Sequence, residues 1–519
     1  MLNGIRLRNF RSLADSGMIE LRPITLLLGQ NSSGKSTFLR ALPLLRQSLR
    51  IRSNAPLLWY GDLVDFGSIR EVKSSFAAED DSVAVCFKFD WLSIVNPYVY
   101  SATNRRLGDV ELGIYLKEID DQTRLCGVKV RVGDDIAELS LDQRAIVNKV
   151  SVNGVDYTRV IPKDRVQLSH TDLVPQVFVI SDTKKEASQA AELLYRALAL
   201  SEHEIFSSFS KWFDRRVSIG TIRAFARRLF YAPEAEFLEK LKSAKLNLKS
   251  WPSVRDHLTS SGSATELSRL RALYMIGGLS DVLYSVSRAL TAAVSGLAYV
   301  GPSRATGERY YRHQELAIDQ IDPQGQNLAM FLYSLPIPER DQFSEWLQQQ
   351  IGYAVRVDRQ GGHIQIELKE VGSPNFHNLA DMGYGFSQIL PVMAQIWGRN
   401  RAQMPARRSG SFVAIEQPEL HLHPAYQARI ADVMASAVTV GKRPRSQQMY
   451  FVVETHSEAL VNRLGELIYK RVLTPDSVAI YLFHRLAKTD ATEITKSTFD
   501  ENGMLKDWPL GFFSSRAAI

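Results

Sequence analysis

The chain has 519 residues, of which 45% are hydrophobic and 23% charged, and its formal net charge at pH 7 is +7. This composition is typical of a globular protein, and the two cysteines, Cys86 and Cys126, are too few for a disulfide framework or a four-thiolate zinc site. No uncharged apolar run is long enough to cross a bilayer and the N-terminus lacks a signal-peptide core, so we expect a cytoplasmic protein with no membrane partner. The length suggests about three units.

The first motif lies near the N-terminus, between an expected strand and an expected helix. Residues 24–28 form a short apolar run typical of a buried strand, and residues 37–42 have helical spacing. Between them the sequence matches the phosphate-binding pattern G-x-x-x-x-G-K-[ST]. Such a turn directs backbone N–H groups and a helix start at one point. The pattern predicts that a nucleoside triphosphate is bound by Gly29, Asn31, Ser32, Ser33, Gly34, Lys35, Ser36 and Thr37.

The stretch from about residue 82 to residue 161 is rich in short β-prone runs. Examples are Val83–Phe89, Val110–Tyr115 and Val128–Val132, and turn pairs such as Gly133-Asp134 and Asn153-Gly154 separate the runs. This pattern predicts an antiparallel subdomain, to which we assign no chemistry.

Between about residues 184 and 297 the spacing becomes helical, and 17 Lys and Arg stand against 11 Asp and Glu. Nearly all of the excess positive charge of the chain therefore lies in this predicted insertion. Its densest part interleaves cations with aromatic side chains, as phosphate-tracking surfaces do. The pattern indicates either a surface for nucleic acid or a nucleic-acid-bearing partner, or a solvated helical face. We call the following residues the basic surface: Lys211, Arg215, Arg216, Arg223, Arg227 and Arg228.

Three stretches after residue 298 have the features of the rest of an ATP site. A glycine-rich turn precedes an expected helix and offers N–H groups to an anion through Gly383, Gly385, Ser387 and Gln388. Next, an apolar strand ends at Glu416, a candidate Mg²⁺ ligand together with the Ser36 hydroxyl. A further apolar strand ends at Glu454, and His456 follows it, placed to contact the γ-phosphate or the attacking water. A zinc set of His421, His423 and His456 is the alternative interpretation.

In this order and spacing, the motifs resemble those of ABC-type ATPases. Gly29–Thr37, Gly383–Gln388, Ile415–Pro424 and Glu454–Ser457 are similar to the Walker A, signature, Walker B/D-loop and switch-histidine motifs. Leu7-Arg8-Asn9-Phe10-Arg11-Ser12 resembles the start of the RecF, Rad50 and OLD group. The closest pattern is that of the Septu and retron-associated ATPases of the PtuA kind, which carry Glu-x-Pro-Glu-Leu-His-Leu-His-Pro and a terminal segment like Phe499–Pro509. The resemblance covers about residues 1–75 and 298–515.

The resemblance implies an α/β, ABC-type P-loop head with a mixed central sheet, an antiparallel β subdomain and a helical insertion. We expect residues 1–183 and 298–519 to build the head and residues 184–297 to form the insertion. ATP would lie between the P-loop of one copy and the signature of another, with Mg²⁺ bound by Ser36 and Glu416. Catalysis would depend on Glu416, Gln417 and His456. Gln417 stands where the family has a Glu, and an amide accepts no proton, so we expect slow hydrolysis unless Glu419 or Glu454 substitutes.

The resemblance also implies a role as sensor or regulator in anti-phage defence. Only 63 residues follow His456, without the acidic cluster of an OLD-type nuclease. We therefore expect a separate nuclease of the HNH type and, in a retron system, a reverse-transcriptase ribonucleoprotein. The alternatives are a DNA-repair ATPase of the RecF kind and a nucleotide-gated clamp on nucleic acid that hydrolyses little ATP.

Overall fold

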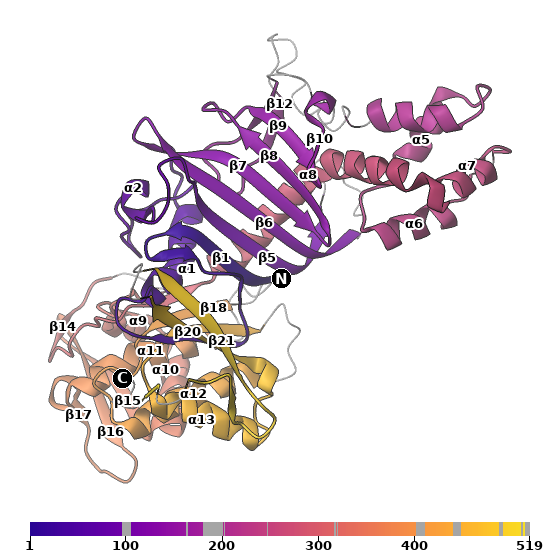
Figure 1. The fold of residues 1–519 in the computed structure, drawn as a ribbon. Helices are drawn as coiled ribbons and strands as arrows, with labels where there is room; N and C mark the ends of the chain where they lie inside the picture. The colour runs from indigo at the N-terminus through magenta and orange to yellow at the C-terminus, as the bar shows by residue number, and fades with distance from the viewer. Residues whose placement is uncertain are drawn as a thin grey trace.

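The computed structural model describes residues 1–95, 105–161, 165–179, 201, 203–246, 248–315, 318, 320–400, 411–439, 448–486, 491–509 and 512–513. These residues form an α/β fold with two large sheets (Figure 1). Within the described ranges, every helix is too short or too polar to cross a membrane.

The central sheet joins strands from both ends of the chain. In spatial order the strands are β13 (Ala298–Val300), β18 (Ser411–Glu416), β19 (Met449–Glu454), β4 (Ile24–Gly29), β20 (Val478–Arg485), β21 (Thr492–Phe499) and β22 (Leu505–Lys506). The pairs from β13 to β20 are parallel, and the last two pairs are antiparallel. The sheet is therefore mixed, as predicted, and the two predicted head segments share it.

The central sheet separates two hydrophobic cores. Successive side chains of a strand point to opposite faces, so Leu27 of β4 joins the core shared with the antiparallel sheet, while Leu26 and Leu28 join the core of the helical lobe. All six residues of β4 are buried, which is typical of a strand covered on both faces.

The second large sheet is antiparallel and has the order β10-β9-β8-β7-β6-β5-β1-β2, with β3 paired to β1. Its strands are β1 (Leu2–Phe10), β2 (Leu13–Asp15), β3 (Ile19–Glu20), β5 (Val83–Ile94), β6 (Arg105–Ile119), β7 (Gln122–Val132), β8 (Asp135–Leu141), β9 (Val147–Val152) and β10 (Val155–Asp156). The three predicted strand runs lie in β5, β6 and β7, and the two predicted turns connect β7 to β8 and β9 to β10. The antiparallel subdomain is thus confirmed, and a short pair, β11 (Val166–Leu168) and β12 (Val177–Val179), follows it.

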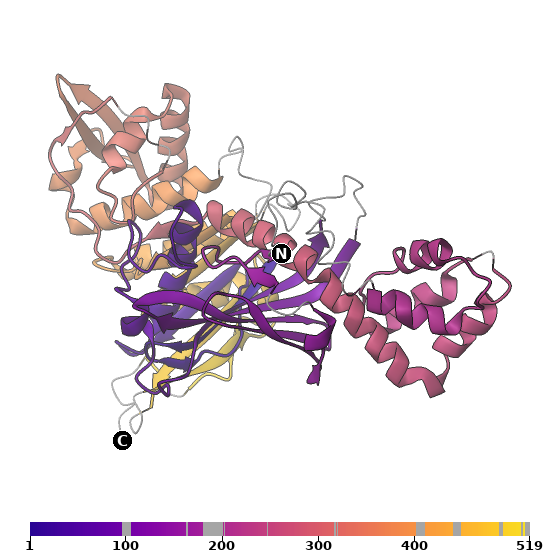
Figure 2. The same ribbon diagram turned by 90° about the horizontal axis from the view of Figure 1, so that it is seen from above.

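The predicted insertion is helical in its described part. It contains helical residues 203–212 and the helices α5 (Ile219–Ala226), α6 (Glu234–Ser243), α7 (Trp251–Leu258) and α8 (Ala264–Ser295). The 32-residue α8 runs along the antiparallel sheet and reaches α1 (Lys35–Arg50). Figure 2 shows the smaller helices projecting from the far end of α8, away from the lobe that contains β14 to β17.

That lobe covers the other face of the central sheet. It contains α9 (Leu328–Ser334), α10 (Ile337–Ile351), α11 (Tyr384–Asn400), α12 (Pro424–Thr439), α13 (Glu458–Tyr469), β14 (Tyr311–Arg312), β15 (Tyr353–Gln360), β16 (His363–Glu370) and β17 (His377–Asn378). A short helix, α2 (Ile69–Val72), lies outside it. Residues 184–200, the beginning of the predicted insertion, lie outside the described residues. The division into domains at 183/184 and 297/298 stays a prediction.

Candidate nucleotide-binding site

The predicted phosphate-binding turn connects the end of β4, at Gly29, to the start of α1, at Lys35. Gly29, Ser32 and Gly34 have positive φ angles of 144°, 59° and 90°. A Cβ atom on Gly29 would lie 2.2 Å from the carbonyl oxygen of Phe483, so this position admits no side chain. The backbone therefore has the tight, glycine-dependent course that turns amides toward an anion.

The side chain of Lys35 is folded against this turn. Its Nζ donates hydrogen bonds of 3.0 Å to the carbonyl oxygen of Gly29 and 2.6 Å to that of Gln30, and it lies 4.0 Å from Oε1 of Glu454. The residue is 2% exposed, and this burial lowers the pKa of its ammonium group. The carbonyl oxygens stand in for phosphate oxygens, which would give stronger, charge-assisted hydrogen bonds.

Two carboxylates meet the turn at the ends of neighbouring strands. Glu416 of β18 lies in register with Glu454 of β19, and β19 pairs directly with β4. The carboxyl ends of parallel strands are the edge at which open α/β sheets bind ligands. The structure therefore brings the predicted P-loop and the two predicted strand ends to one edge of the central sheet.

Glu416 is fully engaged within the chain. Its Oε1 and Oε2 accept hydrogen bonds of 2.7 and 2.8 Å from Nε and Nη2 of Arg40, and Oε1 also accepts one of 2.6 Å from the Tyr299 hydroxyl. The bond to Glu416 raises the pKa of Arg40, while burial and then Glu416 raise the pKa of Tyr299. Arg40 and Tyr299 were missed from the sequence. The role of Glu416 as a Mg²⁺ ligand stays a prediction.

Glu454 has a different environment. It is 4% exposed, and its Oε2 has no hydrogen-bond partner among the described residues. Burial and the negative charge of Glu416 raise the pKa of its carboxyl group, and the Ser36 hydroxyl and Lys35 act in the opposite direction. Glu454 is therefore the strand-end carboxylate that lies with both Lys35 and Ser36.

Gln417, the residue expected to orient the attacking water, and its neighbours Glu419 and His456 make different hydrogen bonds. Gln417 has a positive φ of 43°, and its N–H donates to the carbonyl oxygen of Glu454 at 2.8 Å. Glu419 accepts hydrogen bonds from the Thr455 hydroxyl at 2.8 Å and the His456 N–H at 2.7 Å, one on each oxygen. Glu419 therefore fixes the turn after β19. The His456 side chain is exposed at the rim of this turn. Partial burial and, as the smaller cause, the positive charge of Lys35 lower the pKa of its imidazole.

A buried arginine that the sequence analysis missed links these strand ends to the signature helix. Nη2 of Arg304 donates to the carbonyl oxygens of Glu416 at 2.6 Å and Gln417 at 3.3 Å, and its own carbonyl accepts from Nε2 of Gln388 at 3.4 Å. Burial lowers the pKa of Arg304 to about 10. The only signal in the sequence is the Gly301–Arg304 turn after a short strand.

The signature stretch lies at the N-terminus of α11, on the helical lobe. Gly383 has a positive φ of 81° and is exposed, whereas a Cβ atom on Gly385 would lie 2.9 Å from the carbonyl oxygen of His421. Ser387 and Gln388 are buried, and Ser387 donates to the carbonyl oxygen of Tyr384. The stretch and the loop after β18 line a hollow of about 170 Å³. Contact of this stretch with ATP stays a prediction.

The zinc interpretation finds no support in the described part of the chain, which contains no group of three His, Cys, Asp or Glu side chains able to hold a metal. The ring of His421 packs edge-on against Tyr384 at 4.7 Å, and Nδ1 of His423 accepts from the N–H of Ala425. Both histidines thus have structural contacts of their own.

Comparison with protein-family models matches residues 179–462, more than half of the chain, to the family described as "AAA domain, putative AbiEii toxin, Type IV TA system". The chain belongs to this AAA-domain family. Residues 1–104 match the family described as "AAA ATPase domain", and residues 473–514 match "Protein of unknown function (DUF3696)". The family and the P-loop motif agree, and the chain is an AAA-type P-loop ATPase.

No curated protein sequence matches this AAA-domain protein. Solved structures that it resembles include an SMC head bound to the C-winged helix domain of ScpA, with 12% identity, a TM-score of 0.34 and coverage of 96% of this chain and 98% of the other. The SMC head domain from Thermotoga maritima gives 10% identity, a TM-score of 0.34, and coverage of 95% and 98%.

The AAA-domain protein carries the six cations of the basic surface on the outside of its helical insertion. The interleaved aromatic residues point inward: Phe213 is stacked on Trp251, with ring centroids 6.2 Å apart, and Phe225 meets Trp251 edge-on at 4.7 Å. These rings form the core of the insertion. Phe213 and Phe225 are therefore buried in the insertion, and the candidate surface rests on the six cations alone.

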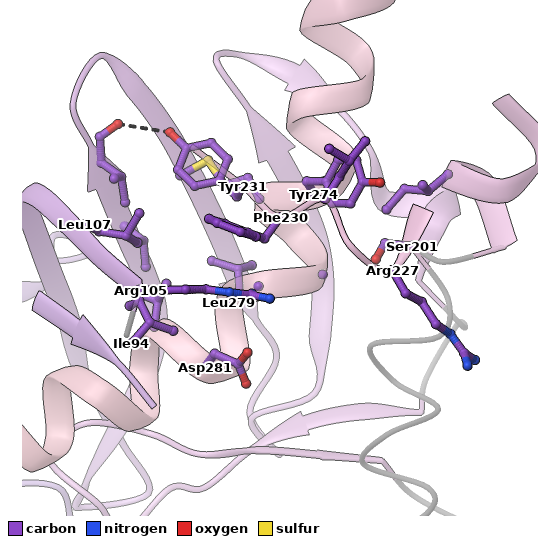
Figure 3. A pocket seen from close by; sticks show the side chains of 18 of the residues that line it. Ile94, Arg105, Leu107, Ser201, Arg227, Phe230, Tyr231, Tyr274, Leu279 and Asp281 are labelled. Atoms are coloured by element: carbon purple, nitrogen blue, oxygen red, sulfur yellow. Dashed lines mark hydrogen bonds between the residues drawn. The ribbon is translucent and has the colours of Figure 1, made fainter. Parts of the chain in front are cut away.

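A separate cavity of about 210 Å³ lies between β5–β7 of the AAA-domain protein and α8 (Figure 3). Its lining includes Leu107, Phe230 and Leu279. Tyr231 donates to the Val132 carbonyl oxygen at 3.1 Å. Its lining contains no residue of the P-loop or of the strand ends at Glu416 and Glu454, so the cavity forms no part of the nucleotide site.

Proposed function

We propose that this AAA-domain ATPase is an ATP-switched regulator whose heads close as a dimer around ATP. The observation that carries the proposal is the meeting of Lys35 and Ser36 of the P-loop with the strand-end carboxylates Glu416 and Glu454 at one edge of the sheet. Charged phosphates need both a cation-lined cradle and a strand-end carboxylate for Mg²⁺.

The described residues fit a Mg²⁺–ATP complex. The turn amides and Lys35 bind the phosphates, and the Ser36 hydroxyl with a strand-end carboxylate offers the hard oxygen ligands that Mg²⁺ prefers. The buried Oε2 of Glu454, without a partner in the described residues, supports this fit. When bound, Mg²⁺ neutralises charge on the β- and γ-phosphates. Burial and Lys35 lower the pKa of His456, which favours the neutral imidazole, a form that can orient water at the rim.

Slow turnover is part of the proposal. Gln417 holds water through hydrogen bonds but accepts no proton, and general-base assistance is worth about 10²–10⁴-fold. A slow ATPase keeps its ATP-bound state for longer, as a switch requires. This feature also favours a second candidate function, a nucleotide-gated clamp with little turnover.

Dimerisation is supported by the position of the signature stretch. Within one chain this stretch packs on the loop after β18, while the P-loop lies at the end of β4, with Asn31 and Ser32 exposed. The exposed Gly383 turn is therefore available to a second copy, which would place its N–H groups on the ATP of the first.

We place this switch in anti-phage defence because the matched family is described as a putative AbiEii toxin of a type IV toxin–antitoxin system. The narrower prediction of a PtuA-like Septu or retron complex, with an HNH nuclease and a reverse-transcriptase ribonucleoprotein, belongs to the same proposal. The basic surface would contact the nucleic acid of such a partner.

Lys35→Ala tests the ATP site. We expect ATP binding to be lost, because the substitution removes the ammonium group that neutralises the phosphates. Equilibrium binding of a fluorescent ATP analogue measures the loss, and gel filtration in ATP follows the dimer. Lys470→Ala changes an exposed lysine at the C-terminal end of α13; it is the control and should bind as the parent does. Equal affinity of the parent and Lys35→Ala for ATP would refute the assignment.

A further inference from the structure

The two strand-end carboxylates are not equivalent. Both oxygens of Glu416 accept hydrogen bonds, from the Arg40 guanidinium and the Tyr299 hydroxyl. To bind a cation, Glu416 would have to break both of its hydrogen bonds to Arg40. The two side chains also form an ion pair, with Nε of Arg40 2.7 Å from Oε1 of Glu416. Such charge-assisted pairs are among the strongest hydrogen bonds in proteins.

Glu454 has the opposite properties. It lies one strand closer to the P-loop, since β19 pairs with β4 and β18 does not. Its carboxyl group interacts with the hydroxyl of Ser36 and lies 4.0 Å from Nζ of Lys35. It is 4% exposed, with Oε2 lacking a partner among the described residues. A buried carboxylate oxygen without a partner carries a large desolvation cost, which a bound cation would remove.

The third nearby carboxylate is already used. Glu419 accepts one hydrogen bond on each oxygen, from the Thr455 hydroxyl and the His456 N–H. Glu419 thus holds the turn after β19 in place. Both of its carboxylate oxygens are used in these two bonds, neither of which involves Ser36.

We infer that Glu454 is the carboxylate that binds the divalent cation together with Ser36, and that Glu416 instead holds Arg40 and Tyr299 in place behind it. This inference rests on the proposed function, since the cation arrives with ATP. The ligand class is a small, hard divalent cation, Mg²⁺ or Mn²⁺, because all the available donors are oxygens. The sequence pattern alone places this role on the residue that ends β18.

The test compares Glu454→Gln, Glu416→Gln and Glu458→Gln. Glu458 is exposed in the first turn of α13 and serves as the matched control, since it undergoes the same change of one charge nearby. The affinity of a fluorescent ATP analogue is measured in EDTA and again in Mg²⁺, and the ratio of the two gives the Mg²⁺ enhancement. Electron paramagnetic resonance counts Mn²⁺ bound with ATP. Neither readout requires hydrolysis.

We expect Glu454→Gln to lower the Mg²⁺ enhancement by about tenfold or more, the size of loss seen even for residues behind the ligands of metal sites. Its ATP affinity in EDTA should equal or exceed that of the parent, because one negative charge near the phosphates is gone, and this result also shows that the variant is folded. Glu458→Gln should match the parent. Glu416→Gln should keep the larger part of the enhancement.

Two other outcomes are distinct. If Glu454→Gln keeps the full enhancement and Glu416→Gln loses it, the inference is wrong while the proposed function stands. If the parent binds no ATP analogue with or without Mg²⁺, the proposed function itself fails, and the inference fails with it.

Discussion

At the end of β18 the backbone of Gln417 adopts the left-handed region, and its N–H donates to the carbonyl oxygen of Glu454. This bond connects the residue after Glu416 to the end of β19, the strand that precedes His456. The amide side chain of Gln417 is thus attached to a backbone fixed from two strands. We therefore expect a substitution at this position to change the chemistry of the side chain and to leave the fold intact.

Gln417→Glu should raise the rate of ATP hydrolysis about tenfold, which requires only ~1.4 kcal/mol off the barrier. A carboxylate at this position can accept the proton of an aligned water, whereas the amide only orients that water. Steady-state phosphate release measures the rate, and gel filtration in ATP should show a shorter-lived assembly.

Gln417→Asn is the control, because it keeps an amide and should gain nothing. If Gln417→Glu is no faster than the parent while Glu419→Gln abolishes turnover, another residue accepts the proton.

The residues of the site differ in how far the sequence could predict them. The P-loop is a local motif, so Lys35 and Ser36 follow from eight consecutive residues. The bond between Arg40 and Glu416 joins positions 376 apart, and no local pattern signals it. The same holds for Tyr299, which only the pairing of β13 with β18 brings to Glu416.

At the scale of elements, α8 connects the smaller helices of the insertion to the nucleotide-binding head. In its middle, Gly277 and Gly278 line the cavity of Figure 3. Glycine in a helix interior costs roughly 1 kcal/mol relative to alanine. These neighbours differ in the space around them: a Cβ atom on Gly278 meets nothing within 4 Å, whereas one on Gly277 would lie 2.3 Å from Oγ of Ser201.

Gly278→Ala should therefore stabilise the protein, increasing the free energy of unfolding by about 0.5–1 kcal/mol. The added methyl group restrains the unfolded chain and enters open space. Thermal unfolding by circular dichroism measures the gain, and slower amide exchange in α8 locates it. Gly277→Ala is the matched comparison and should gain less, because Ser201 has to move. A lower unfolding temperature for Gly278→Ala than for Gly277→Ala would contradict this account.

Whether a segment forms a helix or a strand was predictable where its hydrophobic residues recur with a single period. The alternation in β5 to β7 and the helical spacing of the insertion indicated the correct classes of structure. The inward position of Phe213 and Phe225 was not predictable from the cation-rich run, because interleaved aromatic and basic residues also arise when an amphipathic helix buries one face. Only the packing of α5 and α7 decides which face carries the rings.

For the molecule as a whole, the basic surface lies on the small helices of the insertion and on the turns between them. This part of the insertion projects away from the lobe carrying β14 to β17 (Figure 2). Its six cations are exposed. A partner bound to this surface would leave the nucleotide-binding edge of the central sheet uncovered. ATP binding and partner binding are therefore expected to be separable by mutation.

Reversing Arg215 and Arg216 to Glu should weaken association with nucleic acid or a partner ribonucleoprotein by a similar factor for all sequences. Cations that neutralise phosphates release counterions without reading bases, so the slope of log affinity against log salt should become shallower. On duplex DNA the expected change is ~0.9 for each phosphate that the variant no longer neutralises. Fluorescence anisotropy over a salt series measures both effects. ATP affinity should be unchanged.

The control reverses Arg359 and Lys506, exposed cations outside the insertion, with the same change in net charge. Equal binding and an equal salt slope in the two double variants would show that the basic surface is a solvated helical face.

The central sheet combines strands from both ends of the chain, and this affects how the protein folds during synthesis. Ile24 of β4 pairs with Phe451 of β19 and with Val478 of β20. Strand β4, which precedes the P-loop, leaves the ribosome long before β19 and β20, the two strands with which it pairs, have been synthesised. At elongation rates of ~5–20 residues per second this delay is roughly 20–90 s. During that time the antiparallel sheet and α8 can fold around β1 and β5, while the apolar residues of β4 are left without a sheet. Nascent chains stalled before β19 should therefore need a chaperone and should not bind ATP.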